Sequence, residues 1–254
     1  MPVLPPPPPP LPNVCLGESH ASATHLRIET DALSRLKPWG YHIFLAELPR
    51  DGRAAGERYF RSPRSRGDYE QFLAALVDLA DPALPDTARE EKIGRLAASE
   101  TMAHGIGLTV KAYDAGYQIE FADVPSRQWL GPAMLMKERN EAIAERIAAF
   151  DRQGVLAVNG ANHVADHGDG ARSIKEDLRA GGRDCETFAL TIGGWRADEL
   201  APGLGWKRPA FDHEAASADE ILSALEPKLP QKIPFARPGR AAVPAGRGGR
   251  SVEK

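Results

Sequence analysis

Short apolar runs alternate with amphipathic stretches along most of the chain, and this pattern indicates strands separated by helices. The run 43–46 contains no polar residue, as is typical of a strand that is covered on both faces. Similar apolar runs begin near Asn13, Gly154 and Cys185. The sequence therefore predicts strands at 13–18, 41–48, 108–113, 154–160 and 185–192, with a strand or a loop at 118–124.

Helical spacing of apolar residues occurs between most of these strands. Ser22 is a typical N-cap for a first helix, and the sequence 37–40, Lys-Pro-Trp-Gly, ends it. Gly105 is expected as the left-handed C-cap of a helix that begins near Thr87. The Arg-rich, polar residues 50–67 predict a long exposed loop or lid. Further helices are expected at 68–79, 87–104, 132–152 and 171–180.

The alternation of strands and helices predicts an α/β fold, with a mostly parallel sheet and helices on both faces. A proline-rich linker is expected at 1–12, because the prolines 5–10 favour an extended polyproline II spacer. The α/β domain is expected at 13–195, followed by a C-terminal extension at 196–227 that packs on it. A basic disordered tail is expected at 228–254.

The charge of the chain is unevenly distributed. The tail from Lys228 carries +6, so a net charge of −3 for the whole chain leaves −9 on the remainder. The tail is rich in Pro, Gly and Ala and poor in aromatic residues, which favours a solvated segment over an arm that binds nucleic acid. We therefore expect a small-molecule or peptide substrate as the partner, and no nucleic acid.

Cysteine usage and hydropathy narrow the class of protein further. Cys15 and Cys185 lie in apolar runs without C-x-x-C spacing, which favours small buried hydrophobic residues over a zinc site or a disulfide framework. We find no segment with the pattern of a signal peptide or of a membrane-spanning helix. The sequence predicts a soluble protein that is cytoplasmic or exported by a dedicated secretion system, and it leaves the oligomeric state open.

Candidate chemistry collects at the predicted strand ends. Four predicted strands end on a reactive group: Glu18 with His20 on the first, then Glu47, Asp114 and His163. Ligands of open parallel sheets bind beyond the carboxyl ends of the strands, where such groups come together. We therefore expect Glu18, His20, Glu47 and His163 to line one site.

Arg139 joins this set by a separate argument. It precedes Ile143, Ile147 and Phe150 at helical spacing, so its guanidinium is expected on the face that packs against the sheet. A buried arginine needs an anionic partner or a substrate oxyanion. A structural salt bridge to Glu18 or Glu47 is the alternative interpretation.

Other polar residues are interpreted as structural. Ser19 is flanked like the serine of a nucleophile elbow, but no strands precede it as they do in that fold. His104 is expected in the last turn of a helix, where a cation complements the helix dipole. His25 and His167 are expected on a loop or a helix surface.

Four motifs together resemble the erythromycin esterase, ChaN and Tiki superfamily. They are Gly17-Glu18-Ser19-His20, the acid that closes Phe44-Leu45-Ala46-Glu47, Glu138-Arg139-Asn140 at the start of a helix, and Val158-Asn159-Gly160-Ala161-Asn162-His163. The first motif looks most similar to versions found in bacterial toxins and secreted effectors. The resemblance implies an α/β domain whose pocket is lined by Glu18, His20, Glu47, Arg139 and His163.

The resemblance also implies activities that differ between members, namely ester hydrolysis, metal-dependent proteolysis and haem binding. The leading hypothesis is a hydrolase in which Glu47 or His20 takes a proton from water, His163 is the partner acid or base, and Arg139 stabilises the oxyanion. A metal-assisted variant would use Glu18, His20 and His163 as ligands of Mn, Co or Zn. The alternatives are a ChaN-type module that binds haem or a metal through His20 or His163 without turnover, and an effector that acts by contact alone.

Overall fold

The computed structural model describes residues 10–131, 136–150, 153–164, 172–193, 195–196 and 211–230. In these residues a sheet runs in the order β3-β2-β4-β1-β5, and both β6 and β7 pair with β5. All pairs are parallel except β5 with β6. The strands are β1 (Asn13–Glu18), β2 (Ile43–Pro49), β3 (Gln118–Asp123), β4 (Val155–Gly160), β5 (Cys185–Ile192), β6 (Trp195–Arg196) and β7 (His213–Ala215).

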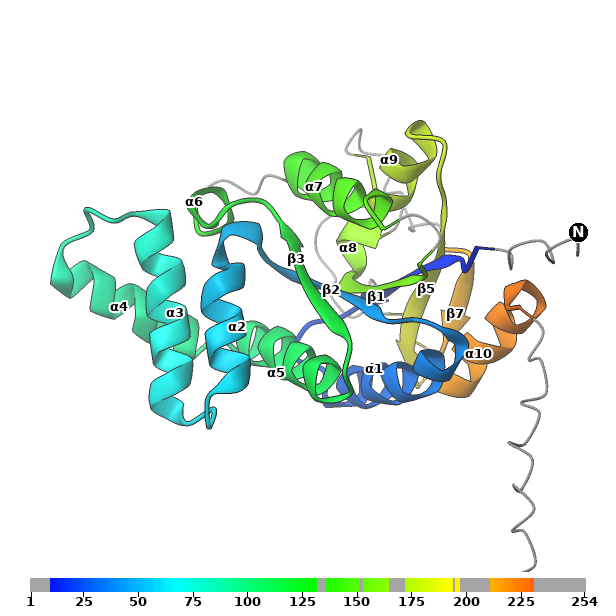
Figure 1. The fold of residues 1–254 in the computed structure, drawn as a ribbon, viewed down its shortest axis with the longest axis horizontal. Helices are drawn as coiled ribbons and strands as arrows, with labels where there is room; N and C mark the ends of the chain where they lie inside the picture. Colours follow the sequence, from blue (N-terminus) through cyan, green and yellow to red (C-terminus); the bar gives the residue numbers. More distant parts are fainter. Residues whose placement is uncertain are drawn as a thin grey trace, which may run out of the picture.

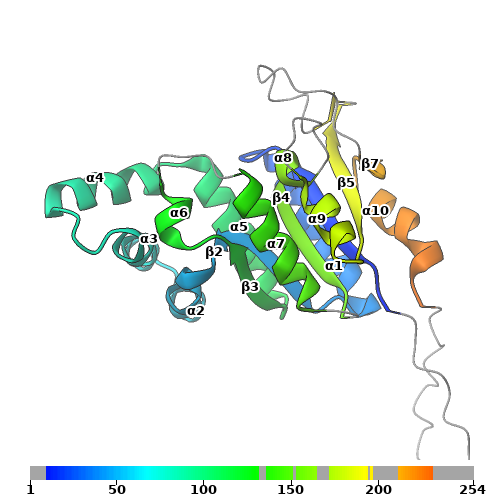
Figure 2. The same ribbon diagram turned by 90° about the horizontal axis from the view of Figure 1, so that it is seen from above.

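Helices cover both faces of this sheet (Figures 1 and 2). They are α1 (Ala23–Leu36), α2 (Arg53–Arg61), α3 (Arg66–Ala80), α4 (Asp86–Ala97), α5 (Glu100–Asp114), α6 (Ser126–Trp129), α7 (Met136–Ala148), α8 (Ala161–Val164), α9 (Ile174–Ala180) and α10 (Ala218–Leu225). Short 3₁₀ turns lie at Lys37–Trp39, Arg50–Gly52 and Glu226–Lys228. The predicted fold class, α/β with a mostly parallel sheet between two helical layers, is confirmed.

Alternation along the strands divides the core into two clusters. Val14 and Leu16 of β1 point into the cluster beneath α1, α5 and α10, whereas Cys15 points into the cluster beneath α7 and α9. Figure 1 shows these two sets of helices on opposite faces of the sheet. Because β1 is covered on both faces, its apolar residues form an unbroken run. Cys15 and Cys185 are both free and buried, as predicted.

Local signals placed several helices correctly. The Ser22 hydroxyl accepts a hydrogen bond from the backbone N–H of His25 at 3.2 Å, which caps α1. After the turn that ends this helix, Gly40 has a φ of +103°, a left-handed conformation that favours glycine. The helices predicted at 68–79, 132–152 and 171–180 correspond to α3, α7 and α9.

The strand predicted at 108–113 is wrong, because these residues belong to α5. Met102, Ile106 and Ala112 are buried at helical spacing, and the Ser99 hydroxyl caps the helix by accepting from the N–H of Met102. The predicted helix 87–104 is therefore two helices, α4 and α5, and Gly105 lies inside α5 and is not a C-cap. The β-branched residues near Thr109 favoured a strand locally, and tertiary packing overrode that preference.

The predicted loop at 50–67 is also wrong. It holds a 3₁₀ turn and α2, whose Ala55, Gly56 and Phe60 are buried. Gly56 lies directly against Phe121 of β3, where a Cβ would come within 2.3 Å of the ring. Three of the six arginines that suggested a loop, Arg53, Arg58 and Arg61, lie on this short helix, and none of the three is buried.

The uncertain segment 118–124 is strand β3, at one edge of the sheet, and it ends on Asp123. Towards the C-terminus, β7 extends the sheet beyond β5, and α10 packs against α1. Most of the linker and of the basic tail, and also His167, lie outside the described residues. The domain boundaries therefore stay a prediction. Among the described helices, none has the length and apolar character needed to cross a membrane.

Candidate functional site

A cavity of about 620 Å³ lies beyond the carboxyl ends of β1, β2 and β4. The five residues singled out from the sequence all line it, from four parts of the chain. Glu18 ends β1 and His20 follows it, Glu47 lies near the end of β2, Arg139 is on α7 and His163 is on α8. The structure therefore brings together side chains that are up to 145 positions apart, since β1, β4 and β2, at whose ends Glu18, His163 and Glu47 lie, are neighbours in the sheet.

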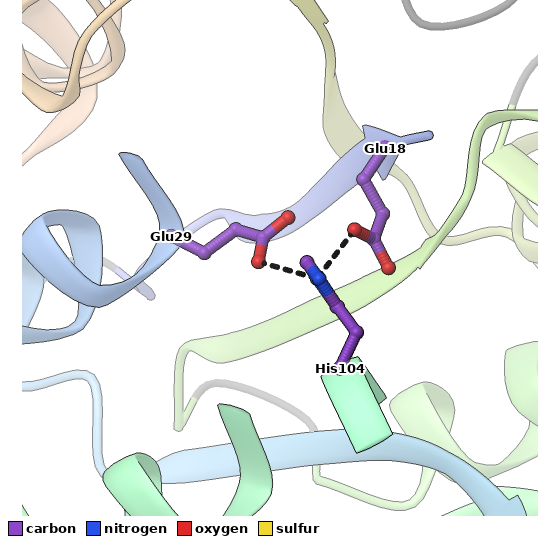
Figure 3. A group of neighbouring side chains, drawn as sticks. All are labelled: Glu18, Glu29 and His104. Atoms are coloured by element: carbon purple, nitrogen blue, oxygen red, sulfur yellow. Dashed lines mark hydrogen bonds and ion pairs between the residues drawn. The ribbon is translucent and has the colours of Figure 1, made fainter. Parts of the chain in front are cut away.

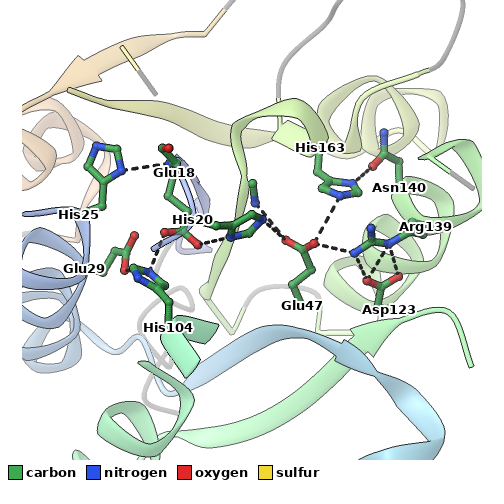
Figure 4. Close-up of polar contacts among 12 residues, drawn as sticks. Glu18, His20, His25, Glu29, Glu47, His104, Asp123, Arg139, Asn140 and His163 are labelled. Carbon is green, nitrogen blue, oxygen red and sulfur yellow. Dashed lines mark hydrogen bonds and ion pairs between the residues drawn. The ribbon is translucent and has the colours of Figure 1, made fainter. Parts of the chain in front are cut away.

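The carboxylate of Glu47 is the centre of this group (Figure 4). One oxygen, Oε1, lies 2.6 Å from Nη2 of Arg139 and 3.4 Å from Nε2 of His163. The other, Oε2, lies 4.0 Å from Nε2 of His20 and accepts a hydrogen bond from the backbone N–H of Gly160 at 3.0 Å. Glu47 therefore faces two imidazoles and one guanidinium.

A bulge in β2 aims Glu47 at the cavity. Ala46 is paired with Phe121 of β3, but the next register pair joins Pro49 to Asp123, so β2 contains one extra residue between them. Such a bulge bends the strand and changes the direction of its side chains. Pairing of β2 with β4 also ends at Ala46, which leaves the N–H of Gly160 free to bind the Glu47 carboxylate.

The surrounding charges fix the protonation of Glu47 and His20. Burial alone would raise the pKa of Glu47, but its contact with His163 and the charges of His20 and Arg139 hold that pKa well below its usual value. Burial would lower the pKa of His20, but its hydrogen bond with Glu18 and the charge of Glu47 raise that pKa to about 9. At neutral pH the site therefore pairs a Glu47 carboxylate with a His20 imidazolium.

Arg139 joins two carboxylates, Glu47 and Asp123. Its Nε donates to both oxygens of Asp123 at 3.1 and 2.9 Å, and its Nη2 lies 2.6 Å from each of the two carboxylates. Of the two salt bridges considered from the sequence, the one to Glu47 forms. Asp123 is fully buried and was not foreseen, because the segment that it closes was not firmly assigned as a strand.

Asn140 fixes the tautomer of His163. The Asn140 amide nitrogen donates to the backbone oxygen of Arg172 at 2.7 Å, so its amide oxygen must be the atom that faces His163. That oxygen lies 2.6 Å from Nδ1 of His163, which therefore carries a proton. The other ring nitrogen, Nε2, is directed at Glu47 and the cavity.

A second buried group of ionisable residues lies behind Glu18 (Figure 3). His104 Nε2 is 2.7 Å from Glu18 Oε2 and 3.1 Å from Glu29 Oε2, and all three residues are buried. The far oxygen of Glu18, Oε1, is 2.9 Å from Nδ1 of His20. The group therefore connects directly to the cavity through Glu18.

The pKa values of the three residues in this second group shift in different directions. Burial raises the pKa of Glu29 to about 8. Burial would also raise the pKa of Glu18, but hydrogen bonds from His104 and His20 lower that pKa to about 2. Burial would lower the pKa of His104, but its bonds to Glu18 and Glu29 raise that pKa to about 10. At neutral pH Glu29 is therefore protonated, and Glu18 lies between two imidazolium ions.

Two histidines are placed differently from the prediction. His104 is not in a last helical turn but inside α5, where it contacts Glu18. His25 is not on a helix surface but fully buried on α1, and its Nδ1 accepts a hydrogen bond from the backbone N–H of Ser19 at 3.0 Å. His104 was misplaced because its partners, Glu18 and Glu29, come from a distant part of the chain.

The predicted metal ligands do not converge on one point. Glu47 lies between the imidazoles of His20 and His163, so these two rings do not face a common position with Glu18 (Figure 4). In the described part of the chain, the ligand atoms that lie within 4.8 Å of one another belong to Glu18, Glu29 and His104. Two carboxylates and one imidazole are suitable donors for Mn, Co or Zn. Here, however, the His104 imidazole already pairs with both carboxylates.

Comparison with known proteins finds solved structures of low similarity to this chain. No protein-family model and no curated protein sequence matches the chain. A solved structure described as the type III effector HopBA1 is similar over 71% of this chain and 77% of its own, with 16% sequence identity and a TM-score of 0.40. A structure described as bacterial protein toxins is similar over 70% of this chain but 33% of its own, with 15% identity and a TM-score of 0.40.

Proposed function

We propose that the protein is a hydrolase that adds water to the carbonyl group of an ester or a peptide. One observation supports this most strongly: a Glu47 carboxylate faces two imidazoles and one guanidinium inside a cavity large enough for a small substrate. Acyl transfer to water needs a base, an acid and a group that stabilises the oxyanion, and these residues supply all three.

His163 is the proposed general base. Asn140 holds its proton on Nδ1, so the Nε2 lone pair is available on the cavity side. During the attack, a water proton moves to Nε2 of His163 and the water oxygen bonds to the carbonyl carbon. Glu47, whose Oε1 lies 3.4 Å from the same Nε2, then stabilises the charge of the imidazolium that forms. His20 is less suited to this step, because its raised pKa keeps it protonated.

His20 and Arg139 are the proposed donors. The oxyanion of the tetrahedral intermediate is stabilised by Arg139, whose contacts with Glu47 and Asp123 use Nε and Nη2. Among the described residues Nη1 has no hydrogen-bond partner, and we assign it to the substrate. When the bond to the leaving oxygen or nitrogen breaks, the Nε2 proton of His20 moves to that atom. The carbonyl carbon keeps the water oxygen, and the released acid completes the hydrolysis.

Three related statements stay predictions. Metal assistance at Glu18, His20 and His163 is one, and haem binding through His20 or His163 is the second. The third is a role as a bacterial toxin or effector module, which depends on the motif resemblance. None of them supplies a step of the mechanism above.

The test is a screen of p-nitrophenyl esters and fluorogenic peptides with the full chain and two variants. We expect His163→Asn and Glu47→Gln each to lower kcat/KM about 10²-fold to 10⁴-fold, since each removes a proton-transfer group or its charge partner. The exposed His42 and Glu90 offer matched controls, and His42→Asn and Glu90→Gln should retain the full rate. Hydrolysis of no ester or peptide, or full activity in both site variants, would overturn the proposal.

A further inference from the structure

The cavity lining contains two chemically different sets of side chains. One is the ionic residues around Glu47, and the other is an apolar wall formed by side chains from α4, α5 and the end of α6. These wall residues are Leu96, Met102, Leu108, Trp129 and Leu130. Apolar walls with a few converging polar groups are typical of small-molecule sites, where the apolar part of the ligand covers the wall.

Gly105 lies in the middle of this wall. Thr101, Met102, Gly105, Leu108 and Thr109 of α5 all line the cavity, at the spacing of one helix face. A Cβ on Gly105 would have no other atom within 4 Å, so a side chain there would extend into the open space of the cavity. Because α5 is helical at this residue, its backbone does not require glycine.

Glycine is also a poor helix former in this position. Gly105 therefore makes α5 less stable than another residue would, and its missing side chain widens the cavity at the apolar wall. Gly107, two residues further along α5, has equally open surroundings but does not line the cavity. The two glycines therefore lie on the same helix in equally open surroundings, but only Gly105 faces the cavity.

We propose that the substrate carries a bulky apolar group that lies along α5 over Gly105, while its carbonyl lies between Glu47, His163 and Arg139. This inference rests on the proposed hydrolase function and names its substrate class, an ester or amide with an aliphatic or aromatic substituent. The substituent can be the acyl chain of an ester or the apolar side chain of a peptide, since the wall offers the same surface to both. Gly105 sets the size of the substituent that fits.

The test compares Gly105→Leu with Gly107→Leu on p-nitrophenyl esters from acetate to octanoate. In the wild type, we expect kcat/KM to rise about fourfold for each methylene that the wall buries. Gly105→Leu should lower kcat/KM for octanoate at least tenfold, mainly through KM, and leave acetate within twofold of the wild type. Gly107→Leu should behave as the wild type. Both variants should keep or raise the melting temperature, because leucine is a better helix former than glycine.

A second arm needs no hydrolysis. The uncharged dye N-phenyl-1-naphthylamine should bind the wild type and Gly107→Leu with increased fluorescence, and Gly105→Leu should bind it at least tenfold more weakly. If the wild type cleaves none of the esters, the hydrolase proposal fails and the dye alone decides on the apolar subsite. The inference is overturned if the wild type does not bind the dye, or if Gly105→Leu binds it as well as the wild type. Among active proteins, equal losses on acetate and octanoate would overturn it too.

Discussion

The amide oxygen of Asn140 lies 2.6 Å from Nδ1 of His163, and the next residue back along α7 is Arg139, whose guanidinium binds Glu47. Two consecutive residues of one helix therefore position two different members of the site. The tautomer of His163 depends on the first, and the orientation of Glu47 depends on the second. A small shift of α7 would change both contacts together.

Replacing Asn140 by leucine should lower kcat about 10²-fold, because the Nδ1 proton of His163 loses its acceptor and the ring can adopt the other tautomer. The measurement is steady-state kinetics together with the ¹⁵N NMR shifts of the His163 ring, which report the tautomer directly. Arg172→Ala is the control, since Arg172 contacts Asn140 through its backbone oxygen and should keep the wild-type rate. Unchanged NMR shifts in Asn140→Leu would contradict the assignment.

Gly160→Ala should displace His20. A Cβ on Gly160 would lie 2.8 Å from Nε2 of His20, closer than any real contact, so the imidazole must move out of line with Glu47. We expect kcat to fall about tenfold to 10²-fold while the far-UV circular dichroism spectrum stays the same.

Gly94→Ala is the matched control for that substitution. Gly94 lies in α4 with no atom within 4 Å of its Cβ position, so this change should leave kcat intact. A crystal structure of Gly160→Ala with His20 in its original place would contradict the argument.

The stability of the protein should fall as the pH rises above about 4.5, and more steeply above about 6.5. The pKa of His104 is raised from 6.5 to about 10 and that of Glu29 from 4.5 to about 8. Between their unfolded and folded values the folded state holds the extra proton, so each such proton lowers the free energy of unfolding by about 1.4 kcal/mol per pH unit. Glu18, whose pKa is lowered to about 2, acts in the opposite direction and loses its contribution as the pH falls below 4.5.

Thermal melts of the wild type and Glu29→Gln between pH 5 and pH 9 measure this effect. The variant should show a shallower decline of melting temperature with pH up to about 8, because its side chain no longer titrates. Glu90→Gln, an exposed change, should follow the wild-type curve. Parallel curves for wild type and Glu29→Gln would show that Glu29 holds no proton in the folded state.

The rate of hydrolysis should decline on the alkaline side near pH 9. His20 must be protonated to donate to the leaving group, and its pKa is raised to about 9 by Glu18 and Glu47. In Glu18→Gln the alkaline limb should move to lower pH, since the hydrogen-bonded carboxylate that holds the proton is gone. A limb that stays at the same pH in this variant would assign the alkaline titration to another group.

The strand ends of the site could be predicted from the sequence because each one is encoded locally. Glu18, Glu47 and His163 each follow a short apolar run, and in a parallel sheet the carboxyl ends of such runs share one edge. Arg139 was found from helical spacing, which is also a local signal. For these residues the prediction needed only the hydrophobic period of an element and the residue at which the element ends. Both can be read within a few positions of the sequence.

The supporting residues could not be predicted in the same way. Glu29 and His104 look like ordinary polar positions of helices, and their burial depends on how α1 and α5 pack over the end of β1. The hydrogen bond between Asn140 and His163 likewise joins residues of two different helices, 23 positions apart in the sequence. Asp123 carried a local signal, as the acid at a strand end, but the β-branched residues near Thr109 drew the strand assignment to the wrong segment.

The position of β1 also has a consequence for synthesis on the ribosome. This strand leaves the ribosome first among the described elements, yet its neighbours β4 and β5 begin 142 and 172 residues later. A nascent chain therefore carries Glu18 and His20 long before β4 and α8 are made, and any product truncated before β4 lacks His163. If the protein is the proposed hydrolase, a nascent chain has no complete site until β4 and α8 have been synthesised.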